Sequence, residues 1–120
     1  MLIDDVHPDR SSLRLTTVFA TLADPVRMRA AQTLARVGEL DCTRLQNEAG
    51  LNVSRSTFSH HQKVLREAGI IQVRVRGARR LLSLRSDDLD ARFPGLLALV
   101  LSAGEENGTA AGGASVGDNG

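Results

Sequence analysis

The side chains best placed to do chemistry lie between positions 54 and 69. At helical spacing, Phe58, Leu65 and other packing residues fall on one face of this segment, and polar or basic residues fall on the other. Hydroxyls near a helix start can approach phosphates closely, and long basic side chains or amides can reach phosphates or base edges. The segment 54–68 is therefore predicted to be a helix that can lie in the major groove of DNA, the alternative being a solvated outer face. Its polar face comprises Arg55, Ser56, Ser59, His60, Gln62, Lys63 and Arg66.

The ends of this helix are marked by residues with known end preferences. Ser54 is suited to the N-cap, where its hydroxyl can accept a hydrogen bond from an otherwise unpaired backbone N–H. Gly69 is suited to the position just after the helix, with Ile70 folding back towards Leu65. The helix is thus expected to end sharply before position 70.

A change of period follows the helix and predicts a β-hairpin. Apolar and polar residues alternate over 71–76, Gly77 makes a turn, and the chain returns over 79–85. A ribbon of this kind, here 72–85, can place arginines on flanking phosphates or in the minor groove. The alternative is an edge whose arginines only prevent strand aggregation, and the hairpin has no interleaved acidic residue that would favour it. The arginines concerned are Arg74, Arg76, Arg79 and Arg80.

The charge of the chain is unevenly distributed. The formal net charge is only +1, but between positions 53 and 86 eight basic residues stand against the single acid Glu67. This stretch carries +7, which leaves −6 for the rest of the chain. A local field of that size is typical of a protein that binds a polyanion.

The segments before position 54 predict three helices. The first is expected over 9–22, the second after the Asp24-Pro25 cap up to Gly38, and the third after the Asp41 cap up to Gly50. The connection 50–53 between the third helix and the polar helix is short and contains glycine. Two helices joined in this way form a helix-turn-helix.

The C-terminal part predicts one more helix and a tail. After a short helical turn from position 86, the last helix is expected from Pro94 to about 103. With the first helix it offers a dimer face, the alternative being that these residues close the core of one protomer. We expect a single domain over 1–103 and a disordered tail over 104–120, which is rich in Gly, Ala and Ser. The predicted dimer residues are Leu15, Val18, Phe19, Leu22, Phe93, Leu97, Val100 and Leu101.

These elements predict a mainly α fold with a small β-hairpin: a winged helix-turn-helix of about five helices and a two-stranded wing. Composition excludes several other classes. Aromatic residues make up 2% of the chain, which argues against stacking of single-stranded nucleic acid. No Gly-rich phosphate loop, nucleophile with its base or metal cluster is present, so we expect no enzyme and no cofactor. A single cysteine and the lack of a signal peptide or membrane-length segment favour the cytoplasm and no membrane association.

Two single residues leave alternatives open. His61 on the inner face is a hydrogen-bonded core histidine or a sensor. Cys42, at the start of the third helix, is a packing residue or a redox-active thiol, because a helix N-terminus favours the thiolate while the adjacent Asp41 opposes it.

Three stretches resemble the ArsR-type winged-helix repressors of bacteria. They are Leu-Ala-Asp-Pro-Val-Arg at 22–27, Ser-Arg-Ser-Thr-Phe-Ser-His-His at 54–61 and Val-Leu-Arg-Glu-Ala-Gly-Ile-Ile at 64–71, and the resemblance extends over about 16–101. It implies a homodimer built on the first and last helices, with paired recognition helices and wings on promoter DNA. It also implies base contacts from the N-terminal half of the recognition helix, which here is Arg55, Ser56, Ser59 and His60.

The chain departs from the family pattern at the positions used for sensing. The Cys-x-Cys pair of many metal-sensing members is replaced by Asp41-Cys42-Thr43, and no histidine follows position 86. One thiolate and one carboxylate do not form a soft metal site, so metal sensing is not expected. Gln62 lies where the family places an apolar residue, which leaves open whether it faces DNA or the core.

The residues together predict a dimeric, sequence-specific transcriptional regulator, a repressor, that binds a pseudo-palindromic operator in double-stranded DNA. The alternative is a winged-helix module that binds a protein and never reads a DNA sequence. No small-molecule effector is identified by the sequence.

Overall fold

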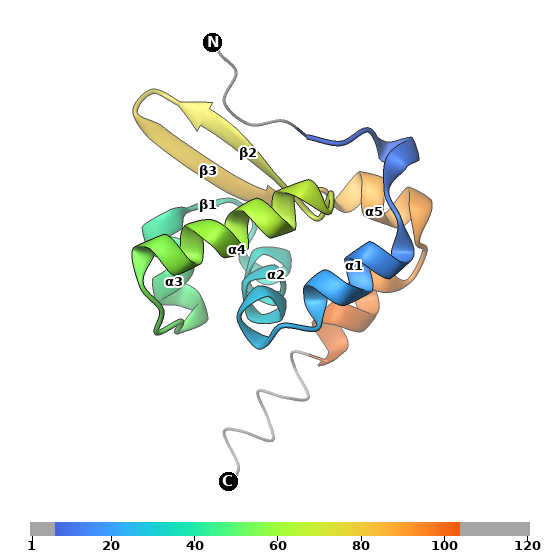
Figure 1. The fold of residues 1–120 in the computed structure, drawn as a ribbon, viewed down its shortest axis with the longest axis horizontal. Helices are drawn as coiled ribbons and strands as arrows, with labels where there is room; N and C mark the ends of the chain where they lie inside the picture. The colour runs from blue at the N-terminus through green and yellow to red at the C-terminus, as the bar shows by residue number, and fades with distance from the viewer. Residues whose placement is uncertain (1–6, 104–120) are drawn as a thin grey trace, which may run out of the picture.

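The computed structural model describes residues 7–103 and contains helices packed against one small sheet (Figure 1). The two longest helices are α2 and α4, with 13 residues each. A further helical segment, 96–103, follows α5. In chain order the elements are η1 Arg10–Ser12, α1 Leu15–Leu22, α2 Pro25–Val37, β1 Leu40–Asp41, α3 Cys42–Ala49, α4 Arg55–Glu67, β2 Ile71–Arg76, β3 Arg79–Leu84 and α5 Ser86–Arg92.

The N-caps predicted from the sequence are formed. The Asp24 carboxylate accepts hydrogen bonds from the backbone N–H groups of Val26 and Arg27 at 2.8 and 3.1 Å. The caps of α3 and α4 are Asp41 and Ser54. Each satisfies backbone donors that a helix start otherwise leaves unpaired, which fixes where these helices begin.

The wing is confirmed, and it belongs to a sheet of three strands rather than two. β2 and β3 pair antiparallel in the register Ile71↔Leu84 to Arg76↔Arg79. β1 adds to the free edge of β3 through Leu40↔Leu82, which gives the order β1-β3-β2. β1 was not predicted from the sequence, because a strand of two residues is too short to show a period.

The first helix is shorter than the predicted segment 9–22. Residues Arg10–Ser12 form a 3-10 turn, Leu13 is extended, and α1 begins only at Leu15. The Leu13 side chain is buried and lies against Gly69, while its carbonyl accepts a hydrogen bond from Arg92. This tertiary packing interrupts the helix and leaves no trace in the local sequence.

The last helical segment begins at 96 rather than at Pro94. Residues between α5 and this segment form a turn in which Gly95 has φ +93° and Leu96 N–H donates to the Phe93 carbonyl. The turn lets 96–103 fold back beside α1, as Figure 1 shows at the lower right. The core that joins these helices to the sheet includes Val18, Leu34, Phe58, Leu65, Ile71 and Leu82.

Candidate nucleic-acid interface

The recognition helix α4 presents the predicted two faces. Phe58, His61 and Leu65 are buried, because they pack under the helix. The side chains of this helix that are predicted to contact DNA lie on the opposite side, and most of them are exposed. These exposed residues are Arg55, Ser56, Ser59, His60 and Lys63, while Arg66 is half-buried.

The ends of α4 determine which of these side chains project from the protein. The Ser54 hydroxyl accepts from the Thr57 N–H at 3.1 Å, so the helix starts immediately before Arg55. At the other end, Gly69 N–H donates to the Arg66 carbonyl and Ile70 N–H to the Leu65 carbonyl, both at 3.0 Å. These two hydrogen bonds end the helix where the sequence predicts, and they require the positive φ of +82° that Gly69 adopts.

Gln62 does not belong to the outer polar face. Its side-chain amide donates to the Cys42 sulfur at 3.2 Å, and both residues are half-buried. Gln62 therefore fills the position between α4 and the start of α3. The helical period had placed Gln62 on the outer polar face, and the family resemblance had left its direction open. The position of α3 decides this, and the outer-face prediction for Gln62 is wrong. Whether Cys42 is redox-active stays a prediction.

His61 is a hydrogen-bonded core histidine, as one of the two alternatives proposed. Its ring is 9% exposed, and Nδ1 lies 3.2 Å from Nη1 of Arg27 in α2. Arg27 also donates from Nε to the Thr21 carbonyl at 2.8 Å. The guanidinium thus joins the recognition helix to the end of α1.

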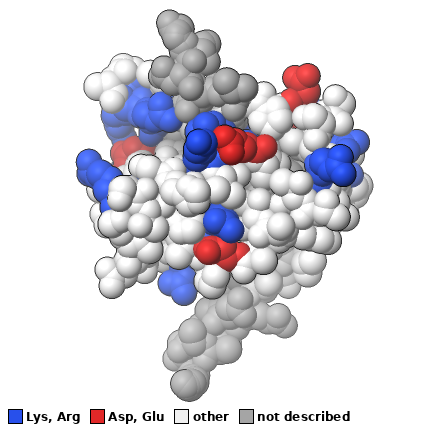
Figure 2. All heavy atoms as spheres, in the orientation of Figure 1, with Lys and Arg blue, Asp and Glu red and all other residues white. Residues whose placement is uncertain are grey.

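Two of the wing arginines are held in ion pairs that the sequence analysis did not foresee. Arg74 binds both carboxylate oxygens of Glu39, at 2.7 and 3.1 Å, and Arg79 binds Asp41 at 2.9 Å. In Figure 2, basic residues gather at the upper left, where Figure 1 places the wing, and acidic residues lie directly below them. The hairpin itself has no interleaved acid, but β1 and the residue before it bring two acids to its side.

These contacts lower the pKa of both acids. The hydrogen bond from Arg74 is the main cause of the lowered pKa of Glu39, and the same pair raises the pKa of Arg74. The pKa of Asp41 is lowered mainly by the backbone N–H of Arg44, and further by Arg79. Both carboxylates are therefore charged at neutral pH and reduce the positive field of the wing on this side.

The recognition helix and the wing lie at the same end of the molecule. Figure 1 shows the N-terminal end of α4 and the tip of the β2–β3 hairpin together on the left, and α1 with the segment 96–103 on the right. Arg76 and Arg80 are exposed on the hairpin. The residues predicted to contact DNA thus lie at one end of the molecule, and the other end is available for a different role.

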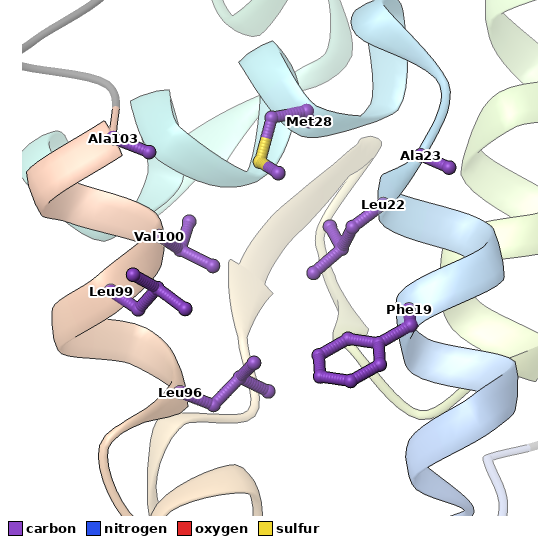
Figure 3. Close-up of a pocket in the computed structure, with 8 residues that line it drawn as sticks. All are labelled: Phe19, Leu22, Ala23, Met28, Leu96, Leu99, Val100 and Ala103. Carbon is purple, nitrogen blue, oxygen red and sulfur yellow. The ribbon is translucent and has the colours of Figure 1, made fainter.

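The opposite end carries an apolar groove of about 380 Å³ between α1, the start of α2 and the segment 96–103 (Figure 3). Phe19 and Leu22 point towards Leu96 and Val100, and Met28 closes one side. Phe19 and Leu99 are 51% and 63% exposed, which is high for large apolar side chains.

The predicted dimer residues divide into two groups. Val18 is fully buried at 0% exposure, and Leu22 and Val100 are also buried, so these three close the core of the protomer. Leu15 and Phe19 are exposed, and Phe93, Leu97 and Leu101 are half-buried. Leu99, the most exposed large apolar residue of the groove, was absent from the prediction, because the helical period does not distinguish a core stripe from a second stripe beside it.

Within residues 7–103, no three His, Cys, Asp or Glu side chains lie close enough together to hold a metal ion. Over the same range, no helix combines the length and apolar character needed to cross a membrane.

Comparison with known proteins gives relatives that agree with one another, although no protein-family model matches the chain. The biofilm growth-associated repressor of Agrobacterium fabrum is 35% identical over 99 residues, which cover 82% of this chain and 81% of that protein. The solved structure of the transcriptional repressor BigR from Xylella fastidiosa has a TM-score of 0.59 and 26% identity, over 74% of this chain and 84% of that one. The homodimeric winged helix-turn-helix DNA-binding domain of Mb0332 from Mycobacterium bovis, a possible ArsR-family regulator, has a TM-score of 0.59 and 27% identity, over 77% and 79%.

Proposed function

Because this chain belongs to the ArsR-type family of winged helix-turn-helix transcriptional regulators, we propose that it is a repressor that binds operator DNA as a homodimer. The recognition helix 54–68 enters the major groove. The wing 72–85 lies on the flanking backbone or in the minor groove. One domain, 1–103, supplies both DNA binding and dimerisation, and the predicted tail at 104–120 lies outside the described residues.

The observation that carries the proposal is the exposed polar face of α4. It combines short hydroxyls, from Ser56 and Ser59, with the longer side chains of Arg55 and Lys63, and all four are exposed. Hydroxyls beside a helix N-terminus suit phosphates, and Arg is the side chain that most often reads guanine in the major groove. The apolar opposite face holds this helix in place, so the exposed groups are presented on a rigid element.

The apolar groove supports the homodimer. Exposed Phe19 and Leu99 flank a groove at the end of the molecule away from α4 and the wing. A two-fold axis through this face would bury both apolar surfaces and leave both recognition helices free. Two such helices would read a pseudo-palindrome with half-sites separated by about one helical turn, roughly 10 base pairs.

We further propose that this regulator is not an enzyme and does not sense metals. Among residues 7–103 the thiol of Cys42 has Gln62 as a neighbour rather than a second soft ligand. Metal addition is therefore expected to leave DNA affinity unchanged, and any inducer would have another chemistry.

The proposal is tested with the full chain and DNA. The wild-type protein first selects its preferred duplex from a random pool, and fluorescence anisotropy then measures its affinity for that duplex and for a scrambled one at several salt concentrations. For about eight phosphates neutralised per dimer, log K should fall against log salt with a slope near −7. Arg55→Ala should relax discrimination at one base position in each half-site. Binding of both duplexes with equal affinity would contradict sequence reading, and no binding at low salt would favour the protein-interaction module.

A further inference from the structure

The guanidinium of Arg27 connects three helices. Its Nε donates to the Thr21 carbonyl at 2.8 Å, and its Nη1 lies 3.2 Å from Nδ1 of His61. Thr21 belongs to the last turn of α1, Arg27 to the first turn of α2, and His61 to the inner face of α4.

Each end of this connection is a group that needs a partner. The last carbonyls of a helix receive no hydrogen bond from within the helix, so the carbonyl of buried Thr21 requires a donor from elsewhere. The helix dipole also favours a cation at this end. The His61 ring is buried, and with a guanidinium N–H facing it Nδ1 acts as the acceptor. Arginine can meet both needs at once because its donors form a fixed fork.

The charges around this contact favour the arrangement. Asp24 caps α2 next to Arg27, and its pKa is lowered. Burial alone would raise this pKa, but the backbone hydrogen bonds from Arg27 and Val26 outweigh burial, and the charge of Arg27 adds to the effect. The carboxylate thus stays ionised beside the guanidinium. These hydrogen bonds therefore fix the backbone from which the Arg27 side chain extends.

We propose that Arg27 is a positioning residue that fixes the orientation of the recognition helix relative to α1, and that selective DNA binding depends on it. This inference rests on the proposed function, because α1 contributes Phe19 to the proposed dimer face. In a dimer built on α1, the angle between α1 and α4 sets where each recognition helix meets the DNA. Hydrogen bonds to base edges require donor and acceptor within a few tenths of an ångström, whereas phosphate contacts by flexible side chains tolerate displacement.

The principal test is Arg27→Met, which keeps the aliphatic stem but removes every side-chain donor. Affinity for the selected duplex should fall about tenfold or more, while affinity for the scrambled duplex should stay within about twofold. The salt slope on the scrambled duplex should be unchanged, because Arg27 is directed into the protein and contacts no phosphate. A slope reduced by about one per subunit would instead identify Arg27 as a phosphate contact and overturn the proposal.

Arg29→Met is the matched control. Arg29 lies on the same helix and also donates to a carbonyl, that of Ala49 in α3 at 3.3 Å. Among residues 7–103 it makes no hydrogen bond to α4. The variant loses the same charge and a similar hydrogen bond, so its preference for the selected duplex should remain that of the wild type. An equal loss of preference in both variants would show a general effect of charge or stability and overturn the proposal.

A double-mutant cycle tests whether Arg27 acts through His61. If it does, Arg27→Met combined with His61→Leu should lose no more preference than either single variant, whereas independent effects would add. The ring nitrogens of His61 give a second readout: nuclear magnetic resonance should show Nδ1 as a hydrogen-bond acceptor in the wild type and in Arg29→Met, and without that bond in Arg27→Met.

The outcomes separate this inference from the proposed function. If the wild type selects a duplex and Arg27→Met retains the same preference, the inference is wrong and the function stands. If the wild type prefers no duplex, both are wrong. Circular dichroism and thermal melting check the fold of each variant. If Arg27→Met does not fold, His61→Leu is tested in its place, because leucine fits an apolar environment. A retained preference for the selected duplex in this variant overturns the proposal, and a lost preference supports it.

Discussion

At the level of single residues, Glu39 controls how much of the wing's charge faces a ligand. Its carboxylate holds Arg74 by two hydrogen bonds, the shorter at 2.7 Å. Both side chains are substantially exposed, so the pair adds little to stability. Its consequence is electrostatic, because a paired arginine neutralises no phosphate.

Glu39→Gln should therefore strengthen binding to any DNA duplex and steepen the salt slope by up to about one unit per subunit, because it releases Arg74. Glu48→Gln, on the exposed face of α3, makes the same change in net charge and has no ion pair with the wing among the described residues. Anisotropy titrations of a scrambled duplex at several salt concentrations compare the two variants. Equal slopes for the two variants would show that only net charge matters.

At the level of elements, the turn between α4 and β2 sets the position of the wing relative to the recognition helix. Gly69 occupies this turn with φ +82°, and a Cβ added there would overlap Cδ2 of Leu13 and lie 3.2 Å from its Cγ. Leu13 is itself buried, so it has little room to move away. The turn thus depends on glycine for both its conformation and its close packing.

Gly69→Ala is expected to lower the free energy of unfolding by about 2–4 kcal/mol, which combines backbone strain with overpacking. Gly77→Ala, in the wing turn at φ +62° with nothing within 4 Å of its added Cβ, carries only the backbone part and should cost about 1 kcal/mol. Urea unfolding of the two variants measures the difference. If Gly77→Ala proves as costly as Gly69→Ala, the Leu13 contact has no role.

A second inter-element connection ties η1 to α5 through Asp88. Its two carboxylate oxygens bind Arg10 at 2.7 Å and Arg85 at 2.9 Å. The hydrogen bond from Arg10, followed by that from Arg85, lowers the pKa of Asp88. A carboxyl whose pKa is lowered on folding contributes stability above its unfolded pKa, here 3.8, and loses that contribution as the pH falls towards the folded pKa.

Asp88→Asn should thus lower stability by about 1 kcal/mol at pH 7, and the difference from the wild type should shrink as the pH falls below about 4. Asp90→Asn, exposed on the same helix and without an ion pair in the described part of the chain, is the matched control and should cost less at pH 7. Thermal melting of the three proteins between pH 3 and 7 provides the measurement. A difference that stays constant over this range would show that the charge of Asp88 does not contribute.

At the level of the whole molecule, the sequence predicted what local signals encode. The caps at Asp24, Asp41 and Ser54 and the two-residue period of the wing are local, and the helix-turn-helix with its wing was confirmed. The misses depend on contacts between distant segments. Leu13 breaks the first helix because it packs on Gly69, and Glu39 reaches Arg74 only once β1 pairs with β3.

The residues of the candidate site divide in the same way, into those predicted from local signals and those that depend on contacts between distant segments. Helical period alone placed most of the polar face of α4 correctly on the outside, with Gln62 as the exception. Gln62 and the dimer stripe required knowledge of what lies opposite them. Val18 faces the core whereas Leu99 faces outward, and a pattern of apolar residues cannot assign them.

The exposed position of Leu99 leads to a prediction about assembly. If two copies join across the groove, a charge at this position would be buried without a partner at the interface, at a cost of several kcal/mol. Because Leu99 is 63% exposed in the protomer, Leu99→Asp should leave the fold and its melting temperature nearly unchanged. The variant should be monomeric at micromolar concentration by analytical ultracentrifugation.

DNA binding should respond to the same change, because a monomer contacts one half-site and loses the benefit of linking two. We expect affinity for the selected duplex to fall by about 100-fold or more, with the salt slope reduced to roughly half. Val37→Asp is the control, since Val37 is also an exposed apolar residue, 46% exposed at the end of α2, and does not line the groove. If Leu99→Asp remains a dimer while Val37→Asp dissociates, the subunits join through a face other than the groove, and the two recognition helices then require a different spacing on DNA.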